Sequence, residues 1–257
     1  MKQAMIRTEQ ESHARILTID RPQARNALSR EAGMTLAAQI EAAGSDPDVR
    51  AIIITGAGDD VFVAGGDLRD YDSLPSNRDG AAQVTRMRVI PEAIERSKVP
   101  VIAAVQGDAY GGGCELLTAC DIVVLEQHVK LHFKQAAMGL ATGWGGGIRL
   151  VERVGAMMAS RLLFTGEVLD ASAALRIGLA SDVAPTGQSL HHALLLTEQM
   201  AKLPRESLTA MKQVLLAFRQ NGRSVALERE RQVFADLWGG PEHRAAMDAF
   251  FRRSPTS

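Results

Sequence analysis

Two short segments that combine glycines with an acid contain the residue types needed to bind a developing negative charge. The first is FVAGGDL, residues Phe62–Leu68, which follows a run of strand character at Ala51–Thr55. The second is GGGCE, residues Gly111–Glu115, which follows the apolar run Val101–Val105. Each glycine run therefore lies where a buried strand is expected to turn towards a helix.

Such turns expose main-chain N–H groups to a ligand. Glycine has no Cβ, so the backbone can approach a ligand closely, and the free N–H groups of a first helical turn favour negative charge. Two turns can each donate one N–H to a single oxyanion beside a carbonyl. One turn alone often only packs a helix onto a sheet, so the pair carries the argument. Glu115 is expected one turn into the second helix.

The elements that must position these turns follow an α/β pattern. Ser29 is expected to cap a helix, and Asp170 is expected to cap a short helix that Gly178 closes. Strands are predicted at residues 4–9, 13–20, 49–55, 101–105, 122–125 and 129–133, and helices at 29–43, 83–97, 114–117, 148–154, 190–203, 205–220, 225–237 and after 241. Residues 74–80 are predicted to form a loop. The chain becomes wholly helical from about residue 187.

Composition indicates a globular chain without a charged partner. The 257 residues include 29 Lys and Arg against 30 Asp and Glu, a net charge of −1, so neither nucleic acid nor an anionic membrane is an expected partner. No stretch has the length or hydropathy of a membrane span or signal peptide, which favours a cytoplasmic location. Cys114 and Cys120 are expected to be buried thiols rather than a disulfide.

Four segments resemble the crotonase superfamily, the enoyl-CoA hydratase/isomerase family. They are IDRPQARNALS, FVAGGDL, AVQGDAYGGGCELLTACDIVV and FTGEVLDASAALRIGLASDVAP. The resemblance covers nearly the whole chain. It implies a spiral of ββα units over residues 1–186, a helical trimerisation region over 187–257, and a homotrimer or hexamer acting on an acyl-CoA thioester. Coenzyme A would then be part of the substrate, and no separate cofactor is expected because the glycine runs lack G-x-G-x-x-G spacing.

The resemblance also assigns roles to single residues. The N–H groups of Gly66 and Gly112 would hold the thioester oxygen, and Glu115 would be the acid-base group. The segment ARNALS either lines the pocket for the CoA adenine or is only a loop before a helix, and Trp144 either walls an acyl pocket or plugs its loop onto the core. The implied substrate-binding residues are Arg25, Ala27, Ala64, Asp67, Leu68, Arg69 and Trp144. Asp67 is also expected to cap its turn.

One departure from the family pattern affects the expected reaction. Hydration uses two acid-base groups on one water, and hydratases of this family carry the second glutamate in a pattern like F-x-x-P-E. Here that segment is FKQAA, residues 133–137, and Ala137 takes the glutamate's place. Loss of CO2 from a malonyl-type thioester forms an enolate without a base, and it is slightly favoured. The segments MGLATGWGGGIRLVERVG and DLWGGPE are similar to the ethylmalonyl-CoA decarboxylase branch.

Other functions are also compatible with the sequence. Glu115 alone could serve a hydratase or isomerase, or the chain could bind acyl-CoA without catalysis. Four side chains are candidates for an auxiliary acid, but none is assigned: Tyr71, Tyr110, His132 and Lys134. No metal site is predicted, because His128 and His132 lack a third ligand at metal-binding spacing.

Overall fold

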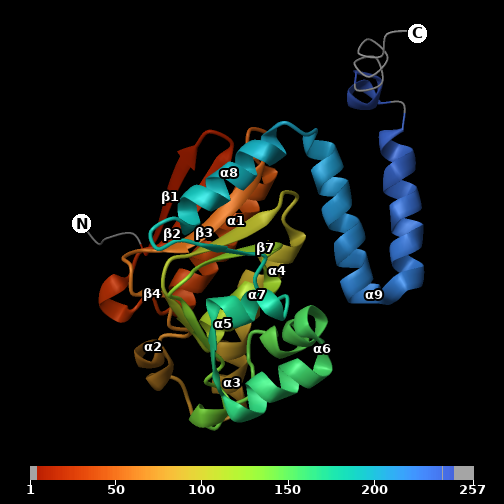
Figure 1. Cartoon of the computed structure of the whole chain (residues 1–257). Helices are drawn as coiled ribbons and strands as arrows, with labels where there is room; N and C mark the ends of the chain where they lie inside the picture. The colour runs from red at the N-terminus through yellow and green to blue at the C-terminus, as the bar shows by residue number, and fades with distance from the viewer. Residues whose placement is uncertain (1–4, 239, 246–257) are drawn as a thin grey trace. The chain divides into compact units, whose positions relative to one another are not determined.

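The structure is a computed structural model that describes residues 5–238 and 240–245 (Figure 1). The chain divides into two compact units, Met1–Glu198 and Gln199–Ser257. The first unit includes most of the helix α8, Ser189–Ala201. All of the residues considered for the functional site belong to this first unit.

A six-stranded sheet forms the centre of the first unit. Strand β1 pairs antiparallel with β2, and every later neighbour in the sheet is parallel. All residues of β3 and β5 are buried, as expected for parallel strands that are covered on both faces. The sheet order is β1 (Ile6–Glu11), β2 (Ala14–Ile19), β3 (Ala51–Gly56), β5 (Val101–Val105), β7 (Ile122–Glu126) and β10 (Asp182–Ala184).

A second, smaller sheet produces the repeat of the fold. Its order is β4 (Val61–Val63), β6 (Asp108–Tyr110), β8 (Lys130–His132) and β9 (Val168–Asp170). Strands β3, β5 and β7 of the first sheet are each followed by a strand of the second sheet and then by helices. This confirms the predicted α/β fold built from ββα units. Strand β6 was not predicted, because its three residues lie in a segment with the pattern of a turn.

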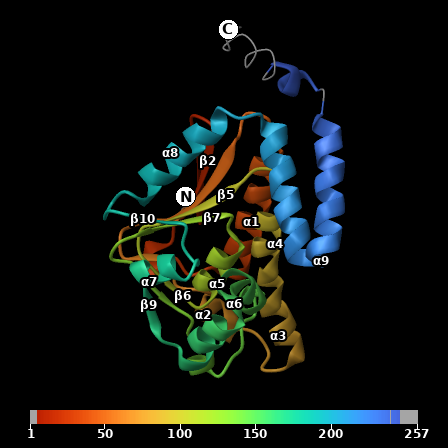
Figure 2. The same ribbon diagram turned by 45° about the vertical axis from the view of Figure 1, so that its right-hand side comes forward.

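Helices cover the strands and begin at the predicted caps. The Ser29 Oγ accepts the Ala32 N–H at 3.2 Å, and the Asp170 carboxylate accepts the Ala173 N–H at 2.7 Å. The helices are α1 (Arg30–Ser45), α2 (Leu68–Asp72), α3 (Arg78–Thr85), α4 (Val89–Arg96), α5 (Gly112–Ala119), α6 (Gly146–Thr165) and α7 (Ala171–Arg176), with short 3-10 helices at Pro22–Ala24, Arg86–Arg88 and Ala136–Met138. Figure 2 shows α1 and α4 in the same layer.

The single helix predicted over residues 83–97 is wrong. The segment contains the end of α3, a 3-10 turn and α4, and Asn77 caps α3 inside the predicted loop by accepting the Asp79 and Gly80 N–H groups. Pro91 lies in the first turn of α4. Proline has no N–H to donate, so a helix that contains it begins close to it.

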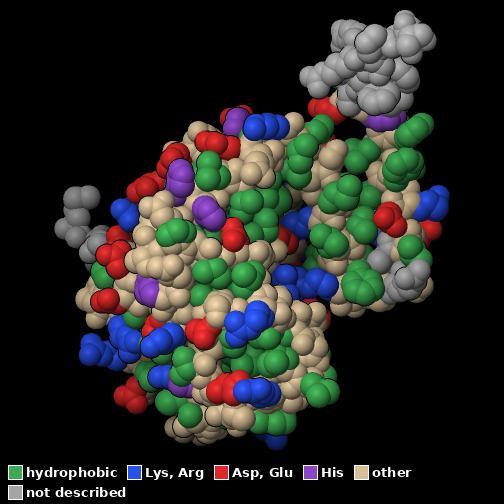
Figure 3. All heavy atoms as spheres, in the orientation of Figure 1, with side chains coloured by type: hydrophobic (Ala, Val, Ile, Leu, Met, Phe, Trp, Pro, Cys, Tyr) green, Lys and Arg blue, Asp and Glu red, His purple; other side chains and the backbone are tan. Residues whose placement is uncertain are grey.

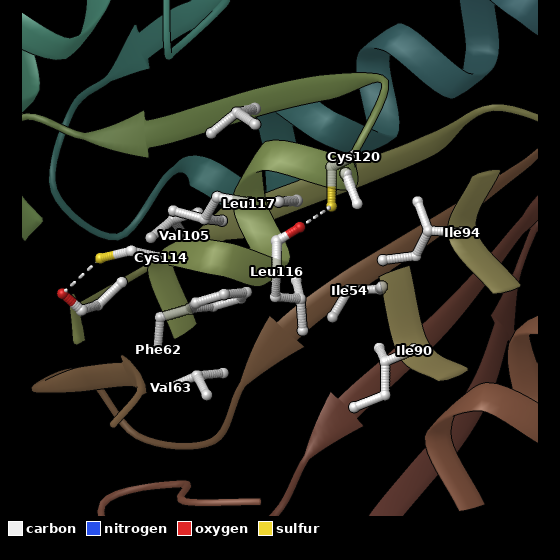
Figure 4. Close-up of a cluster of buried hydrophobic side chains, with 14 of the residues drawn as sticks. Ile54, Phe62, Val63, Ile90, Ile94, Val105, Cys114, Leu116, Leu117 and Cys120 are labelled. Atoms are coloured by element: carbon white, nitrogen blue, oxygen red, sulfur yellow. Dashed lines mark hydrogen bonds between the residues drawn. The ribbon is translucent and has the colours of Figure 1, made fainter. Parts of the chain in front are cut away.

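Helix α5 lies in the hydrophobic core, as Figure 4 shows. The two cysteines at its ends are buried and free, as predicted. The Cys114 Sγ donates to the Ala109 carbonyl at 3.1 Å, and the Cys120 Sγ donates to the Leu116 carbonyl at 3.6 Å. Leu116 and Leu117 are fully buried around them, so the helix that carries Glu115 is fixed by packing on several sides.

The described part of the second unit is mainly α9, Arg205–Leu237. Gly222 has a φ of +77° and interrupts this helix, so its two halves run side by side in both views (Figures 1 and 2). The break lies between the two helices predicted for this segment. Of the helix predicted after residue 241, residues 241–245 are helical, and the rest lies outside the described residues.

Figure 3 shows basic and acidic side chains interspersed over one face of the first unit. This distribution agrees with the balanced composition of the sequence. Over the described ranges 5–238 and 240–245, no helix is both long enough and apolar enough to cross a membrane.

The buried side chain of Asn26 supports the loop between β2 and α1, and its loss should destabilise the fold. Its Nδ2 donates to the carbonyls of Ala57 and Val61, and its Oδ1 accepts the Arg21 N–H. We expect Asn26→Ala to lower the free energy of unfolding by about 2–4 kcal/mol, measured by urea denaturation. Gln23→Ala, at an exposed position of the same loop, should change it by less than about 0.5 kcal/mol. Equal effects of the two variants would contradict this role.

Candidate active site

The two glycine turns identified in the sequence lie against each other. Strands β4 and β6 are parallel neighbours, so the turns that follow them leave the same edge of the second sheet. A Cβ on Gly65 would stand 3.0 Å from the Gly112 nitrogen, and Gly65 itself has a φ of +96°. Both facts favour glycine at this position. The sequence analysis did not single out Gly65, although its place before Gly66 in the family motif was available as a signal.

The N–H groups of Gly66 and Gly112 are left without protein acceptors. Leu28 bonds to both neighbours of Gly66: it donates to the Gly65 carbonyl at 2.8 Å and accepts the Asp67 N–H at 3.0 Å. The Gly66 N–H therefore points away from Leu28. Gly112 is the first residue of α5, where an N–H has no partner within the helix. Within the described ranges, neither N–H donates to another residue.

Two aromatic rings cover these glycines. The Tyr71 ring lies across Gly66, where an added Cβ would stand 2.3 Å from Cε2 and 2.6 Å from the hydroxyl oxygen. The Trp144 ring lies across Gly112, with an added Cβ 2.7 Å from Cη2. Trp144 is only 3% exposed. Tyr71 is half-buried, so the two rings shield this side of the turns from solvent without sealing it.

The Tyr71 hydroxyl is a neutral donor with no acceptor. Burial, and then the nearby Asp70 carboxylate, raise the pKa of Tyr71 to about 12. Its oxygen is buried and forms no hydrogen bond of normal geometry with any residue of the described ranges. The phenol therefore keeps its proton at neutral pH and does not donate it to a protein acceptor within the described ranges.

The Glu115 carboxylate is buried and accepts four N–H groups. Its Oε1 accepts the Gln135 Nε2–H at 2.9 Å and the Gly143 N–H at 3.3 Å. Its Oε2 accepts the Trp144 N–H at 2.8 Å and the Gly146 N–H at 2.9 Å. A carboxylate offers about four lone-pair sites. In this arrangement Glu115 fastens the Trp144 loop and the start of α6 to α5.

A second contact braces the same loop from the other side. Arg149 of α6 makes two hydrogen bonds of 2.8 Å to the Glu95 carboxylate of α4, and it also donates to the Trp144 carbonyl at 3.3 Å. Both side chains of this ion pair are largely buried. The sequence analysis missed the pair because its members are 54 positions apart.

The position that corresponds to the family's second glutamate is on the surface. Ala137 is exposed in the 3-10 helix Ala136–Met138. Two residues earlier, Gln135 reaches Glu115 instead. Its amide nitrogen faces the carboxylate, and its Oε1 is buried without a partner among the residues that the structure describes. The sequence analysis did not assign a role to Gln135.

Asp67 has the capping role expected of it. Its side chain accepts the Arg69 N–H at the start of α2, and it pairs with Arg21 at 2.7 Å. Burial alone would raise the pKa of Asp67, but the hydrogen bonds from Arg21 and from the Arg69 N–H lower it overall. Its neighbours Leu68 and Arg69 are exposed.

The remaining predicted binding residues lie on the loop between β2 and α1 and beside it. Arg25 is exposed, with its guanidinium carbon 4.9 Å from the centre of the Tyr110 ring, and it borders a cavity of about 510 Å³. Ala27 is buried and accepts a hydrogen bond from Arg21 through its carbonyl. The Ala64 N–H donates to the Arg25 carbonyl at 3.1 Å, which ties this loop to the first glycine turn. Within the described part of the chain, no three His, Cys, Asp or Glu side chains are grouped to hold a metal ion.

Weakening the Glu115 acceptor should destabilise the protein. Glu115→Gln keeps the size of the side chain but replaces one acceptor oxygen by an N–H₂ group that faces buried donors. We expect the free energy of unfolding to fall by about 2–5 kcal/mol, measured by chemical denaturation. Glu41→Gln, which alters an exposed pair with Arg96, should cost less than about 1 kcal/mol. A Glu115 variant as stable as the wild type would show that the four contacts do not hold the loop.

Comparison with known proteins identifies the relatives of this chain. The family model for enoyl-CoA hydratase/isomerase matches residues 9–256. The chain is 35% identical over 241 residues to 2,3-dehydroadipyl-CoA hydratase of Escherichia coli (strain K12), covering 93% of this chain and 92% of that protein. It is 32% identical over 241 residues to ethylmalonyl-CoA decarboxylase of Gallus gallus, covering 93% and 80%.

The fold is shared as well. The crystal structure of enoyl-CoA hydratase from Bacillus anthracis matches with a TM-score of 0.90 at 25% identity, over 97% of this chain and 96% of that one. Family and fold thus agree over nearly the whole length. This protein belongs to the enoyl-CoA hydratase/isomerase family of the crotonase superfamily, a family of acyl-CoA enzymes.

Proposed function

We propose that this protein releases CO2 from a malonyl-type acyl-CoA and holds the resulting enolate oxygen between the N–H groups of Gly66 and Gly112. The observation that carries this proposal is the state of Glu115, whose carboxylate already accepts four N–H groups. The position of the second acid is Ala137, which is exposed and has no proton to give. The pair of acid-base groups that hydration uses is therefore missing.

Decarboxylation needs the parts that are present. The bond between the α-carbon and the carboxylate breaks, CO2 leaves, and the electron pair forms the thioester enolate. The charge collects on the thioester oxygen, where preorganised N–H donors act most strongly. Two donors at that oxygen are worth on the order of 3 kcal/mol each in the transition state.

The charges around the site support this chemistry. Three guanidinium groups on the segments around the site are each paired with an acid: Arg21 with Asp67, Arg30 with Asp70, and Arg149 with Glu95. None of these three is available to hold the substrate's carboxylate. A carboxylate facing the Tyr71 and Trp144 rings is desolvated, which favours its loss as neutral CO2.

In this proposal the coenzyme A part of the substrate approaches along the first glycine turn. Arg25 and Ala27 contact its adenine end, beside the cavity that Arg25 borders. The other proposed binding residues are Ala64, Asp67, Leu68 and Arg69 along the turn, with Trp144 against the acyl group. No cofactor beyond the thioester's own coenzyme A is required, since the enolate forms without redox chemistry.

A thioester panel tests the proposed reaction. The wild-type protein should release CO2 from ethylmalonyl-CoA or methylmalonyl-CoA and form the saturated thioester. Hydration of crotonyl-CoA should be at least about 100-fold slower in kcat/KM, because the second acid-base group is absent. Liquid chromatography of the thioesters, with trapping of CO2, measures both. Fast hydration without CO2 release would overturn the proposal.

A second candidate is hydration of an enoyl-CoA with Glu115 as the single acid-base group, which the 35% identity to a hydratase favours. Glu115→Gln separates the two candidates. It abolishes crotonyl-CoA turnover in a one-base hydratase, whereas a decarboxylase whose Glu115 only holds the loop keeps measurable CO2 release. Binding of thioesters without turnover of any would instead indicate a non-catalytic relative.

The contact between the glycine turns gives a test of the oxyanion site. Gly65→Ala places a Cβ 3.0 Å from the Gly112 nitrogen, so the second turn must shift. We expect kcat to fall about 100-fold or more. Gly187→Ala is the matched control, because Gly187 has a φ of +78° and an added Cβ would meet no atom within 4 Å. Both variants should lose about 1–2 kcal/mol of stability from backbone strain, but only Gly65→Ala should lose turnover.

We also propose that the protein assembles as a homotrimer or a pair of trimers. Helix α9 exposes large apolar side chains that include Met211, Leu215, Phe218 and Phe234, and its C-cap residue Trp238 is exposed as well. Exposed apolar surface of this extent is typical of protein interfaces.

A further inference from the structure

Two buried polar atoms of the site have no hydrogen-bond partner among the described residues. They are the Tyr71 hydroxyl and the Gln135 Oε1. Leaving such a group unsatisfied costs about 1–3 kcal/mol. The Tyr71 hydroxyl lies beside Gly66. The nearby Trp144 indole N–H can donate to its oxygen but cannot accept its proton, so this donor is left free where a substrate would sit.

We propose that the Tyr71 hydroxyl donates the proton that completes the reaction, to the α-carbon of the enolate held by Gly66 and Gly112. This rests on the enolate chemistry of the proposed function. The enolate has two basic atoms, its oxygen and its α-carbon. The two N–H groups occupy the oxygen, so a donor beside Gly66 meets the carbon next to it.

The site leaves few other sources for this proton. The Tyr71 oxygen is shielded from bulk water, and the Trp144 side chain beside it is only 3% exposed. The Glu115 carboxylate accepts four N–H groups from Gln135 and the segment 143–146, so its oxygens face the loop. An amide such as Gln135 is far too weak an acid for this transfer.

The other candidates from the sequence lie elsewhere. The Tyr110 hydroxyl donates to the Asp108 carboxylate at 2.8 Å. The Lys134 Nζ lies 4.6 Å from the centre of the Tyr110 ring, and the centres of the His132 and Tyr110 rings are 6.4 Å apart. These three form one cluster around Tyr110. Of these four candidates, Tyr71 is the one whose hydroxyl lies at the glycine turns with no acceptor among the described residues.

The step balances in protons and electrons. The electron pair left by CO2 takes the Tyr71 proton and forms the new C–H bond of the saturated thioester. Tyr71 becomes a phenolate, which is a much weaker base than the enolate carbon. Water admitted on product release returns the proton to the phenolate. The same step completes hydration, because addition of water to an enoyl thioester also ends with protonation of the α-carbon.

Tyr71→Phe is a clean test of this role. The hydroxyl proton has no acceptor among the described residues, and the oxygen faces only the weak donor contact of the Trp144 indole, so the free energy of unfolding should change by less than about 1 kcal/mol. We expect kcat to fall about 100-fold or more, with a smaller change in KM. In D2O the wild type should place deuterium on one face of the α-carbon, and the variant should give a racemic label, measured by NMR of a chiral ester of the product acid. Tyr110→Phe, which removes the chain's other phenol, should keep the labelling stereospecific.

The assay is run with ethylmalonyl-CoA and with crotonyl-CoA, so the two proposals fail separately. Slow, racemic protonation by Tyr71→Phe supports the role of Tyr71 with either thioester, even if the wild type only hydrates and the decarboxylase proposal is lost. Wild-type rate and stereochemistry in Tyr71→Phe overturn the inference while CO2 release by the wild type stands. If Tyr71→Phe is slower but still places deuterium on one face of the α-carbon, Tyr71 acts as a hydrogen-bond donor to the enolate oxygen. That result overturns the proposed proton transfer. No turnover of either thioester by the wild type overturns both.

Discussion

The arrangement of the site depends on one buried carboxylate. Glu115 of α5 accepts three main-chain N–H groups from the segment 143–146 and one side-chain N–H from Gln135. These bonds place Trp144 against Gly112 and begin α6 where its N–H groups meet the acid. A buried charge is stable only when it is compensated in this way. The packing of α5 therefore fixes the Glu115 carboxylate, and the carboxylate in turn fixes the segment that carries Trp144.

This use of Glu115 limits the chemistry of the site. A base must have a lone pair facing the proton that it removes, and here the lone pairs face the loop. The Arg149–Glu95 pair holds the same loop from α4, so a large movement of Trp144 would have to break both sets of contacts. Glu115 thus holds the loop at residues 143–146 in place. The N–H groups of Gly66 and Gly112 and the Tyr71 phenol beside them have no acceptor among the described residues.

Much of this site was predictable from local sequence. Strand-to-turn patterns located both glycine runs, and the caps Ser29 and Asp170 gave the helix starts because a cap acts within three residues of itself. The single helix predicted over residues 83–97, which the structure divides, shows the limit of periodicity, since Pro91 lies close to a helix start that the apolar pattern did not indicate. The family motif supplied Gly66, Gly112 and Glu115. Their roles in turnover are still predictions.

Other features have no local signal. The contacts of Glu115 with residues 143–146 and of Arg149 with Glu95 join positions that are distant in sequence, and only the ββα spiral brings them together. The Tyr71 hydroxyl is a different case, because its importance comes from the absence of a hydrogen-bond acceptor for it among the described residues. A buried phenol that the fold leaves unsatisfied lowers stability, and Phe at this position would avoid that penalty at almost equal volume. The hydroxyl is therefore best explained by a partner that arrives with the substrate.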